Sequence, residues 1–175
     1  MPQYNFGTAS EKATWLNGVE APGVPMKPGG KYNDPGSVPN DVVEAWAAFL
    51  KEQGVTRTIC LLKKEELDCY AAPGYEAILK AAGVEPAMVD IFQEGAKDSI
   101  LDAARAAKEA GDKVAIHCSG GEGRTGLGLG AILADQCALS AEEAAAEVVT
   151  HAGATGVARK VKPEKLSALI ENGKA

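Results

Sequence analysis

The sequence predicts an α/β fold in which a central, mostly parallel sheet is flanked by helices. Short apolar runs typical of strands alternate with longer segments in which apolar residues recur at helical spacing. Glycine or proline stands at most of the changes from one kind of segment to the other. The chain has 175 residues, enough for one domain to bury a core without disulfides. Strands that alternate with helices predict a parallel sheet covered on both faces.

The first 39 residues are rich in the residues that interrupt regular structure. They predict irregular structure with short strands near Tyr4–Thr8 and Trp15–Val19, and the polar run at 27–36 predicts an exposed loop. We interpret residues 1–39 as an irregular N-terminal segment packed on a main domain of residues 40–175, with a single domain overall. The six prolines of this segment are Pro2, Pro22, Pro25, Pro28, Pro35 and Pro39.

Residues 40–112 carry three predicted helices and two predicted strands. Asn40 is the expected N-cap of the first helix, which Gly54 ends. The elements that follow are a strand at Val55–Leu62, a charged turn at Lys63–Leu67, a helix at Tyr75–Ala82, a strand at Pro86–Ile91 and a helix at Gly95–Ala110.

The C-terminal part begins with a predicted strand at 113–118, a glycine-rich loop and a helix to about Ala138. Ser140 and Glu143 form a predicted capping box that starts the next helix, which runs to about Ala152. Pro163 begins the last helix, which ends near Ile170.

Composition and charge exclude several classes of function. The net charge is −6 and the pI is near 5.0, which argues against nucleic-acid binding and against an anionic membrane surface. No apolar run approaches the roughly 20 residues that span a bilayer, and the N-terminus does not read as a secretory signal, so we expect a cytoplasmic protein. We expect no metal and no cofactor, because the sequence has no Cys-x-x-Cys pair and only two histidines. The cysteines are Cys60, Cys69, Cys118 and Cys137.

The stretch Lys113–Gly130 predicts an anion site. A strand, a tight glycine loop and a helix N-terminus leave backbone N–H groups without internal partners, and these groups converge on whatever lies in the loop. Cys118 ends the strand and faces the helix N-terminus, which favours its thiolate form. Arg124, six residues on, has a planar guanidinium that can hold two phosphate oxygens.

The remaining residues of the loop have predicted supporting roles. Thr125 can donate its hydroxyl to the sulfur of Cys118, and His117 is expected to orient the loop rather than to act as a base. The predicted phosphate-binding residues are Ser119, Gly120, Gly121, Glu122, Gly123 and Arg124.

The pattern His117-Cys118, five residues, Arg124-Thr125 resembles the signature of the protein tyrosine phosphatase superfamily. The run Gly121-Glu122-Gly123-Arg124, followed by Gly126, is similar to the dual-specificity branch. The resemblance implies hydrolysis of phosphomonoesters without a metal. Cys118 would attack phosphorus to form a phosphocysteine, which water then hydrolyses. The implied substrate is a protein phosphorylated on Tyr, Ser or Thr, or a small phosphomonoester.

The resemblance also implies an acid on a loop that follows an earlier strand. Asp90 is the favoured residue, because it lies at the end of a predicted strand 28 positions before Cys118. Glu94 and Asp98 in the same region are rivals, and the loop proline usual in the family is absent after Asp90.

Other interpretations of the loop stay open at this point. Gly121-x-Gly123-x-x-Gly126 matches a dinucleotide fingerprint, but the strand with an acidic residue that should follow is missing. A rhodanese-like thiol enzyme and a phosphate-binding pseudophosphatase without turnover are further alternatives. Glu122 stands where phosphoinositide-preferring relatives carry Lys, which predicts rejection of such headgroups. A basic stretch after the penultimate helix is interpreted as a solvated turn in preference to a flank of the cleft; it holds His151, Arg159, Lys160 and Lys162.

Overall fold

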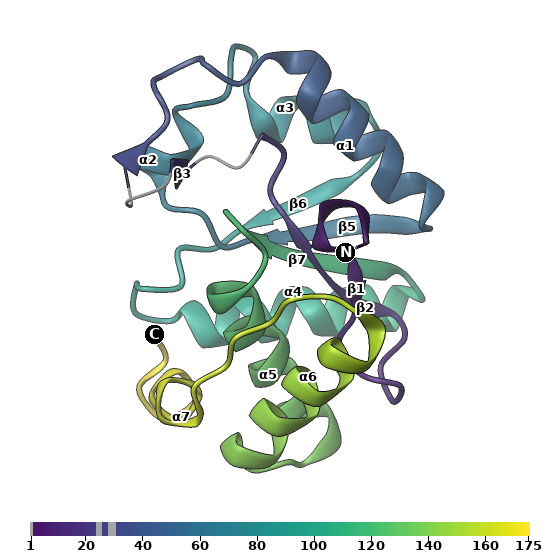
Figure 1. Cartoon of the computed structure of the whole chain (residues 1–175), viewed down its shortest axis with the longest axis vertical. Helices are drawn as coiled ribbons and strands as arrows, with labels where there is room; N and C mark the ends of the chain where they lie inside the picture. Colours follow the sequence, from purple (N-terminus) through teal and green to yellow (C-terminus); the bar gives the residue numbers. More distant parts are fainter. Residues whose placement is uncertain (1, 24–25, 28–30) are drawn as a thin grey trace.

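The computed structural model describes residues 2–23, 26–27 and 31–175. Its centre is a five-stranded sheet in the order β1-β2-β7-β5-β6 (Figure 1). The neighbours β2, β7, β5 and β6 pair in parallel, and only the short edge strand β1 is antiparallel. The strands are β1 (Gly7–Thr8), β2 (Leu16–Glu20), β5 (Val55–Cys60), β6 (Glu85–Met88) and β7 (Lys113–Cys118), and a separate pair is formed by β3 (Met26–Lys27) and β4 (Lys31–Tyr32).

Helices cover both faces of this sheet, which confirms the predicted fold class. Helices α1 and α3 lie on the upper face in Figure 1, and α4, α5, α6 and α7 lie below it. The helical elements are the 3-10 turn η1 (Gln3–Asn5), α1 (Asn40–Glu52), α2 (Lys64–Leu67), α3 (Tyr75–Ala81), α4 (Ala96–Ala110), α5 (Gly123–Cys137), α6 (Ala141–Thr155) and α7 (Pro163–Asn172). The predicted capping box at Ser140 and Glu143 is present at the start of α6.

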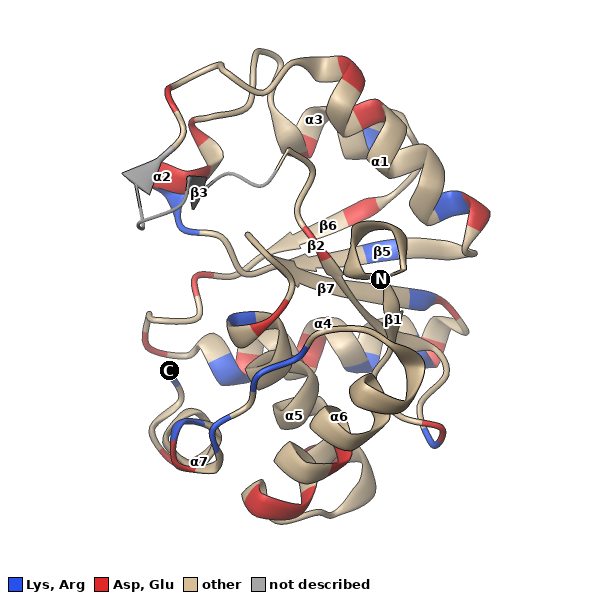
Figure 2. Cartoon of the chain, viewed as in Figure 1, with Lys and Arg blue, Asp and Glu red and all other residues tan. Residues whose placement is uncertain are grey.

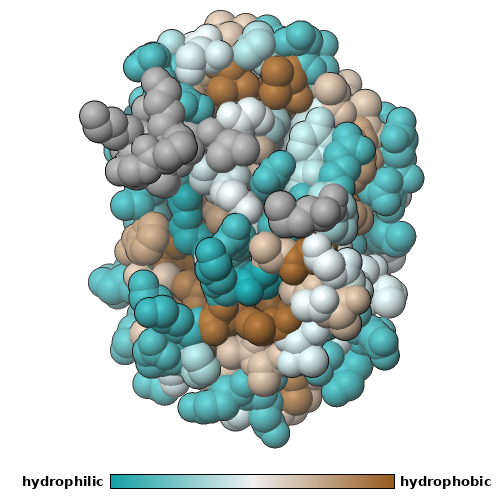
Figure 3. All heavy atoms as spheres, in the orientation of Figure 1, coloured by the Kyte–Doolittle hydropathy of each residue, from teal (hydrophilic) through white to brown (hydrophobic). Residues whose placement is uncertain are grey.

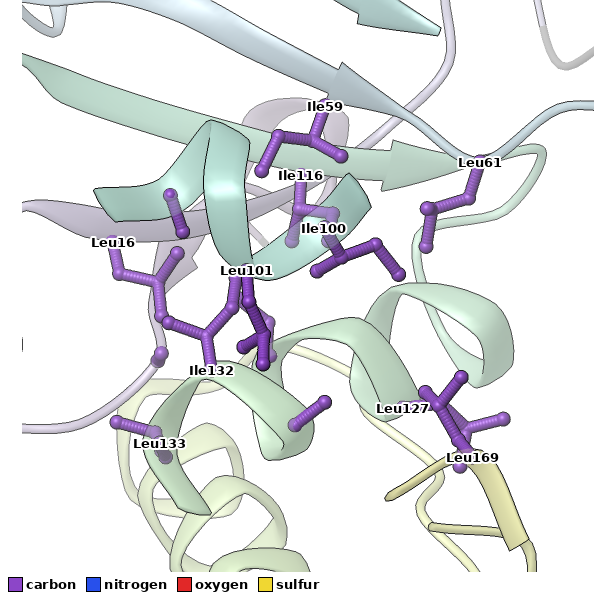
Figure 4. Packing of buried hydrophobic residues seen from close by; sticks show 14 of the residues in the cluster. Leu16, Ile59, Leu61, Ile100, Leu101, Ile116, Leu127, Ile132, Leu133 and Leu169 are labelled. Carbon is purple, nitrogen blue, oxygen red and sulfur yellow. The ribbon is translucent and has the colours of Figure 1, made fainter. Parts of the chain in front are cut away.

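Two apolar cores result, one on each face of the sheet. Successive strand residues point to opposite faces, so β7 sends Val114 and Ile116 to the lower core and Ala115 to the upper core. Figure 4 shows Ile116 packed with Ile59, Ile100 and the leucines of the lower core. Burial of each such side chain contributes about 1.5–3 kcal/mol, so these layers fix the strand from which the glycine-rich loop departs.

Three glycines let α5 lie deep in the lower layer. A Cβ on Gly126 would fall 2.8 Å from Val161, and one on Gly130 would fall 2.7 Å from Leu166. A Cβ on Gly128 would collide with Ile116. These glycines therefore serve helix packing.

In the described part of the chain, only helices α6 and α7 follow α5. The dinucleotide interpretation of Gly126 is wrong, because no strand with an acidic end follows in the described residues.

The N-terminal segment is more regular than predicted. The strand expected near Trp15–Val19 exists as β2 and lies inside the sheet, paired along its length with β7. The strand expected at Tyr4–Thr8 is instead η1 followed by the two-residue β1. Of the predicted exposed loop at 27–36, residues 28–30 lie outside the described residues.

Two further expectations need correction. Pro39 rather than Asn40 occupies the N-cap of α1, and the amide of Asn40 donates to the carbonyl of Ala72 instead. The charged turn at Lys63–Leu67 is a single helical turn, α2, which becomes important at the site.

The outer surface is mainly hydrophilic in the view of Figure 3, with apolar atoms gathered over part of the lower helical layer. Among the described helices, none combines the length and apolarity needed to cross a bilayer.

Candidate active site

The glycine-rich loop lies at the carboxyl edge of the sheet, at the end of β7. The two neighbours of this strand, β2 and β5, both run parallel to it. Strand β7 ends at Cys118 and α5 begins at Gly123, so residues 119–122 form a short connection over the edge. The backbone of this loop is tied to β2, because the N–H of Ala21 donates to the carbonyls of Cys118 and Ser119. Ligands of parallel α/β sheets bind outside this edge, where helix N-termini offer free N–H groups.

Cys118 lies at the base of the loop and is only 4% exposed. The hydroxyl of Thr125, in the first turn of α5, donates to its sulfur over 3.2 Å. This is the hydrogen bond predicted from the sequence. The hydroxyl of Thr125 and the N-terminus of α5 both direct positive partial charge toward the sulfur.

His117 is buried in the upper core and does not face the loop as a base. Its Nε2 shares a hydrogen bond of 2.5 Å with the hydroxyl of Tyr75, and its ring packs edge-on against Trp46. Burial lowers the pKa of His117 to about 3, with the positive charge of Arg124 acting in the same direction. Tyr75 and Trp46 thus hold the neutral imidazole in place near the end of β7.

Arg124 is held by a buried carboxylate. Its two terminal nitrogens donate to the two oxygens of Glu66 over 2.5 and 2.7 Å, and one of them also reaches the carbonyl of Leu61. The side chain of Glu66 is 1% exposed and accepts a further hydrogen bond from the N–H of Lys63. Burial lowers the pKa of Arg124, but the hydrogen bonds to Glu66 and the nearby thiol outweigh it and raise the pKa. A bidentate pair of this kind fixes the plane of the guanidinium.

The glycines of the loop have different roles. Gly121 adopts a left-handed φ of 69°, and a Cβ there would lie 2.8 Å from the backbone of Val19 and Glu20. A Cβ on Gly120 or Gly123 would meet no described atom within 4 Å. Gly121 is thus required by the packing of the loop on β2, whereas Gly120 and Gly123 leave open space in which an anion can approach the backbone.

Glu122 does not stand at the loop as an isolated negative charge. Its carboxylate pairs with the ammonium of Lys160 over 2.5 Å, in the connection between α6 and α7 that carries the basic residues seen in Figure 2. The pair is largely exposed, so its contribution to stability is small. The negative charge that was predicted to repel phosphoinositide headgroups is therefore partly neutralised.

The predicted basic turn is also less solvated than expected. Arg159 is buried behind the loop and donates to the carbonyl of Gly121 over 2.8 Å. His151, on α6, is hydrogen-bonded to the hydroxyl of Thr8 over 2.8 Å.

Asp90 follows β6, two strands away from Cys118 at the same edge of the sheet. Strands are spaced by about 4.8 Å, which separates the ends of β6 and β7 by roughly 10 Å. Its carboxylate accepts from the N–H of Phe92 over 3.0 Å and from the side chain of Gln93 over 3.4 Å. Glu94 is exposed in the same loop, and Asp98 lies on the first turn of α4 with its side chain 73% exposed and paired with Lys97.

Several residues at this site were not predicted. Glu66, Arg159 and Asn5 all contact the loop or Arg124, across 38 to 115 residues of sequence. Glu66 stands three residues after the N-cap of α2, a position typical of a capping glutamate. That pattern indicates a helix start, but nothing in it indicates the pairing with Arg124.

No protein-family model matches the chain, and no curated protein matches it. Several solved structures, however, match the chain. The kinase associated phosphatase KAP superposes with a TM-score of 0.64 at 18% identity, over 89% of this chain and 83% of that one. The chain therefore shares the fold of this solved phosphatase, a mostly parallel five-stranded sheet flanked by helices.

Two more solved structures show the same fold. PTPMT1, solved in complex with PI(5)P, gives a TM-score of 0.60 at 18% identity over 89% of this chain and 88% of that one. The PTP-2 phosphatase of Cydia pomonella gives 0.58 at 17% identity over 95% and 89%. At these identities the likeness is one of fold.

Proposed function

We propose that the protein is a cysteine-dependent phosphomonoesterase of the dual-specificity type, which acts on proteins phosphorylated on Tyr, Ser or Thr through a phosphocysteine intermediate. One observation carries the proposal. The sulfur of Cys118 at the end of β7 and the side chains of Arg124 and Thr125 in the first turn of α5 flank the short loop at the helix N-terminus. This arrangement supplies a nucleophile and an anion site at the same place.

The first step transfers the phosphoryl group to sulfur. The Cys118 thiolate attacks phosphorus, the S–P bond forms, and the bond from phosphorus to the ester oxygen breaks. Backbone N–H groups of the loop and the N–H groups of Arg124 that Glu66 and Leu61 do not use, on Nε and on one terminal nitrogen, receive the charge on the three equatorial oxygens in the transition state. Because Glu66 already holds the guanidinium in one plane, little reorganisation is required.

Asp90 is the proposed acid for the leaving oxygen. Its place at the carboxyl edge, two strands from Cys118, supports this role, since the ends of β6 and β7 open on the same edge of the sheet. The carboxyl would then exchange its hydrogen bonds to Phe92 and Gln93 for one to the ester oxygen. Asp98 is less well placed, because it belongs to the rigid first turn of α4 and points to solvent.

The second step restores the enzyme. Asp90, now a carboxylate, takes a proton from water while the water oxygen attacks phosphorus. The S–P bond breaks, inorganic phosphate leaves, and the thiolate is stabilised by the hydroxyl of Thr125. The same residue thus serves first as acid and then as base.

The rim of the site supports an aryl phosphate as substrate. Phe92, two residues after Asp90, is 44% exposed, and the ammonium of Lys63 lies 4.5 Å from the centre of its ring. An exposed aromatic ring beside the acid offers a surface on which a phenol ring can stack. PTPMT1 was solved with a phosphoinositide, so lipid headgroups are the competing substrate class for this site.

Phosphatase assays test the proposal. The wild type should hydrolyse an aryl phosphate and phosphopeptides, and the Cys118→Ser protein should not. Arg124→Lys should lose nearly all of the rate, because an ammonium cannot replace the bidentate fork. Phosphoinositides, assayed in parallel, should be poorer substrates than phosphotyrosine peptides. Tight binding of inorganic phosphate without turnover of any substrate would identify a pseudophosphatase instead.

A further inference from the structure

Arg159 is a buried cation directly behind the phosphate loop. It lies in the connection between α6 and α7 and is 6% exposed. One terminal nitrogen donates to the carbonyls of Gly121 and Ala158, each over 2.8 Å. The other donates to the carbonyl of Asn5 over 2.8 Å. All of these acceptors are neutral backbone groups.

The charge of Arg159 has no ion-pair partner within residues 2–23, 26–27 and 31–175. Its Nε is buried there without a hydrogen-bond partner. Glu122, the acidic residue nearest in the loop, is paired with Lys160. Burial lowers the pKa of Arg159 to about 10, while the thiol of Cys118 and the carboxylate of Glu122 act to raise it. Buried charges in proteins are normally matched by an opposite charge, so this guanidinium is in an unusual position.

Asn5, in the N-terminal segment, holds the same region by side-chain hydrogen bonds to Gly120 and Ala158, which we call the clasp. Its side-chain amide donates to the carbonyls of Ala158 over 3.0 Å and Gly120 over 3.4 Å, and its oxygen accepts from the N–H of Ala158 over 2.8 Å. The backbone at Tyr4 and Asn5 has left-handed φ angles of 52° and 51°. Two consecutive non-glycine residues in this region are costly, and such strain persists only where surrounding contacts impose it.

The clasp leaves little room for Arg159 to move. A Cβ on Gly18 of β2 would lie 2.6 Å from one terminal nitrogen of the guanidinium and 2.8 Å from Nε. Strand β2, the α6–α7 connection and η1 therefore hold the guanidinium from three sides, although they are far apart in the sequence.

The geometry has a direct consequence for the loop amides. In a trans peptide, the carbonyl of one residue and the N–H of the next point in opposite directions. Asn5 and Arg159 hold the carbonyls of Gly120 and Gly121 on the protein side. The N–H groups of Gly121 and Glu122 are thereby turned the other way, toward the space beside Gly120 and Gly123, which is open to an anion.

We propose that Arg159, clasped by Asn5, is a positioning residue that sets the loop amides for phosphate and whose unpaired charge strengthens phosphate binding. The inference rests on the proposed function, since it assigns this charge to the phosphate that the loop receives.

Binding of inorganic phosphate to the Cys118→Ser protein provides the test. Calorimetry would compare this parent with versions that also carry Arg159→Met, Arg159→Lys or Lys162→Met. Arg159→Met should weaken phosphate binding about 10- to 100-fold, the range expected for loss of a charged partner. Lys162→Met removes the same charge from an exposed position in the same connection, and should change the affinity by less than about twofold.

Arg159→Lys separates charge from mere packing. It keeps the charge but loses the forked contacts, so its melting temperature should fall with that of Arg159→Met while its phosphate affinity stays closer to the parent. Equal weakening in both variants would overturn the electrostatic part of the proposal. A folded Arg159→Met protein that binds phosphate within twofold of the parent would overturn all of it.

Asn5→Ala gives a second route if Arg159→Met does not fold. It removes the clasp on Gly120 and Ala158 without changing any charge, and should weaken phosphate binding about 3- to 10-fold, as expected for loss of one or two net hydrogen bonds. Unchanged affinity in this variant would contradict the clasp. A parent protein that binds no phosphate would instead refute the proposed function, and the inference with it.

Discussion

Arg124 and Glu66 form a largely buried bidentate pair that joins the first turn of α5 to the helical turn α2. Both terminal nitrogens of the guanidinium donate to the carboxylate, over 2.5 and 2.7 Å. The two residues are 58 positions apart in the sequence. The pair fixes how the fork faces the loop, so the rate of phosphoryl transfer should depend on a residue that does not touch the substrate.

Glu66→Gln should therefore impair catalysis while the overall fold is kept. The amide retains the shape of the carboxylate but presents only one acceptor oxygen, so the guanidinium is free to tilt. A misplacement of about 1 Å can cost roughly 100-fold in rate, and we expect kcat/KM to fall 10- to 100-fold. Steady-state kinetics with an aryl phosphate would measure this. Glu65→Gln, on the exposed side of the same turn, is the matched control; equal activity in the two variants would show that Glu66 has no such role.

Asp90 should matter most for substrates with poor leaving groups. A phenol with a high pKa needs a proton as it departs, whereas a nitrophenol does not. Asp90→Asn should reduce kcat for unactivated aryl phosphates by about 10²–10⁴-fold, the usual contribution of a general acid, and should steepen the dependence of rate on leaving-group pKa. Asp98→Asn and Glu94→Gln should leave that dependence unchanged. If Asp98→Asn steepens it instead, the acid is on α4.

Two glycines of the loop should differ in how much an added Cβ lowers the stability of the protein. Gly121→Ala places a Cβ 2.8 Å from the backbone of β2 at a left-handed φ. It should lower the free energy of unfolding by about 1–3 kcal/mol. Gly120→Ala meets no described atom within 4 Å. It should change that free energy by less than about 0.5 kcal/mol. Urea unfolding of both variants measures the contrast, and equal destabilisation would contradict the packing described for Gly121.

The buried neutral His117 should make the protein sensitive to acid. Its pKa is lowered to about 3 in the folded state, against about 6.5 in an unfolded chain. Between these values the unfolded chain binds a proton that the native protein does not, so stability is present above pH 6.5 and is lost as the pH falls. The loss from this residue should be about 1.4 kcal/mol per pH unit.

Urea unfolding at a series of pH values between 7.5 and 4.5 would test this prediction. The slope of unfolding free energy against pH should be smaller in His117→Asn than in the wild type by about 1.4 kcal/mol per pH unit, the contribution of one proton. His151→Asn, which replaces the partly buried histidine on α6, should keep most of the wild-type slope. Identical slopes in His117→Asn and the wild type would mean that His117 binds a proton as readily in the folded protein as in the unfolded chain, and would contradict the lowered pKa.

The parts of the molecule that the sequence predicted are those encoded by local patterns. Helix bounds followed from apolar spacing and from glycine stops such as Gly111, which takes the left-handed conformation at the end of α4. The hydrogen bond from Thr125 to Cys118 could be predicted because both residues belong to one loop. The N-terminal strand β2 was expected, but its place beside β7 was not, because Asn17 and Gly18 are weak strand formers.

The contacts missed by the sequence analysis are long-range. Glu66 reaches Arg124, and Asn5 and Arg159 reach the loop carbonyls, only because the sheet order brings β2, β5 and β7 together. Arg159 appeared to be part of a solvated basic turn, since a cluster of charged residues usually is one. Its burial depends on the narrow space that Gly18 leaves on β2, and one glycine in a strand does not indicate which side chain will fill that space.

The most direct test of the account is rapid-mixing kinetics of the wild type with a nitrophenyl phosphate. A phosphocysteine on Cys118 requires release of nitrophenol before inorganic phosphate, with the phosphoryl group held on the enzyme between the two events. In Asp90→Asn, where activation of water is slowed, we predict a burst of about one nitrophenol per enzyme and a phosphorylated peptide containing Cys118 after quenching. Simultaneous release of nitrophenol and phosphate, with no phosphoryl group on Cys118 in either protein, would contradict the covalent mechanism.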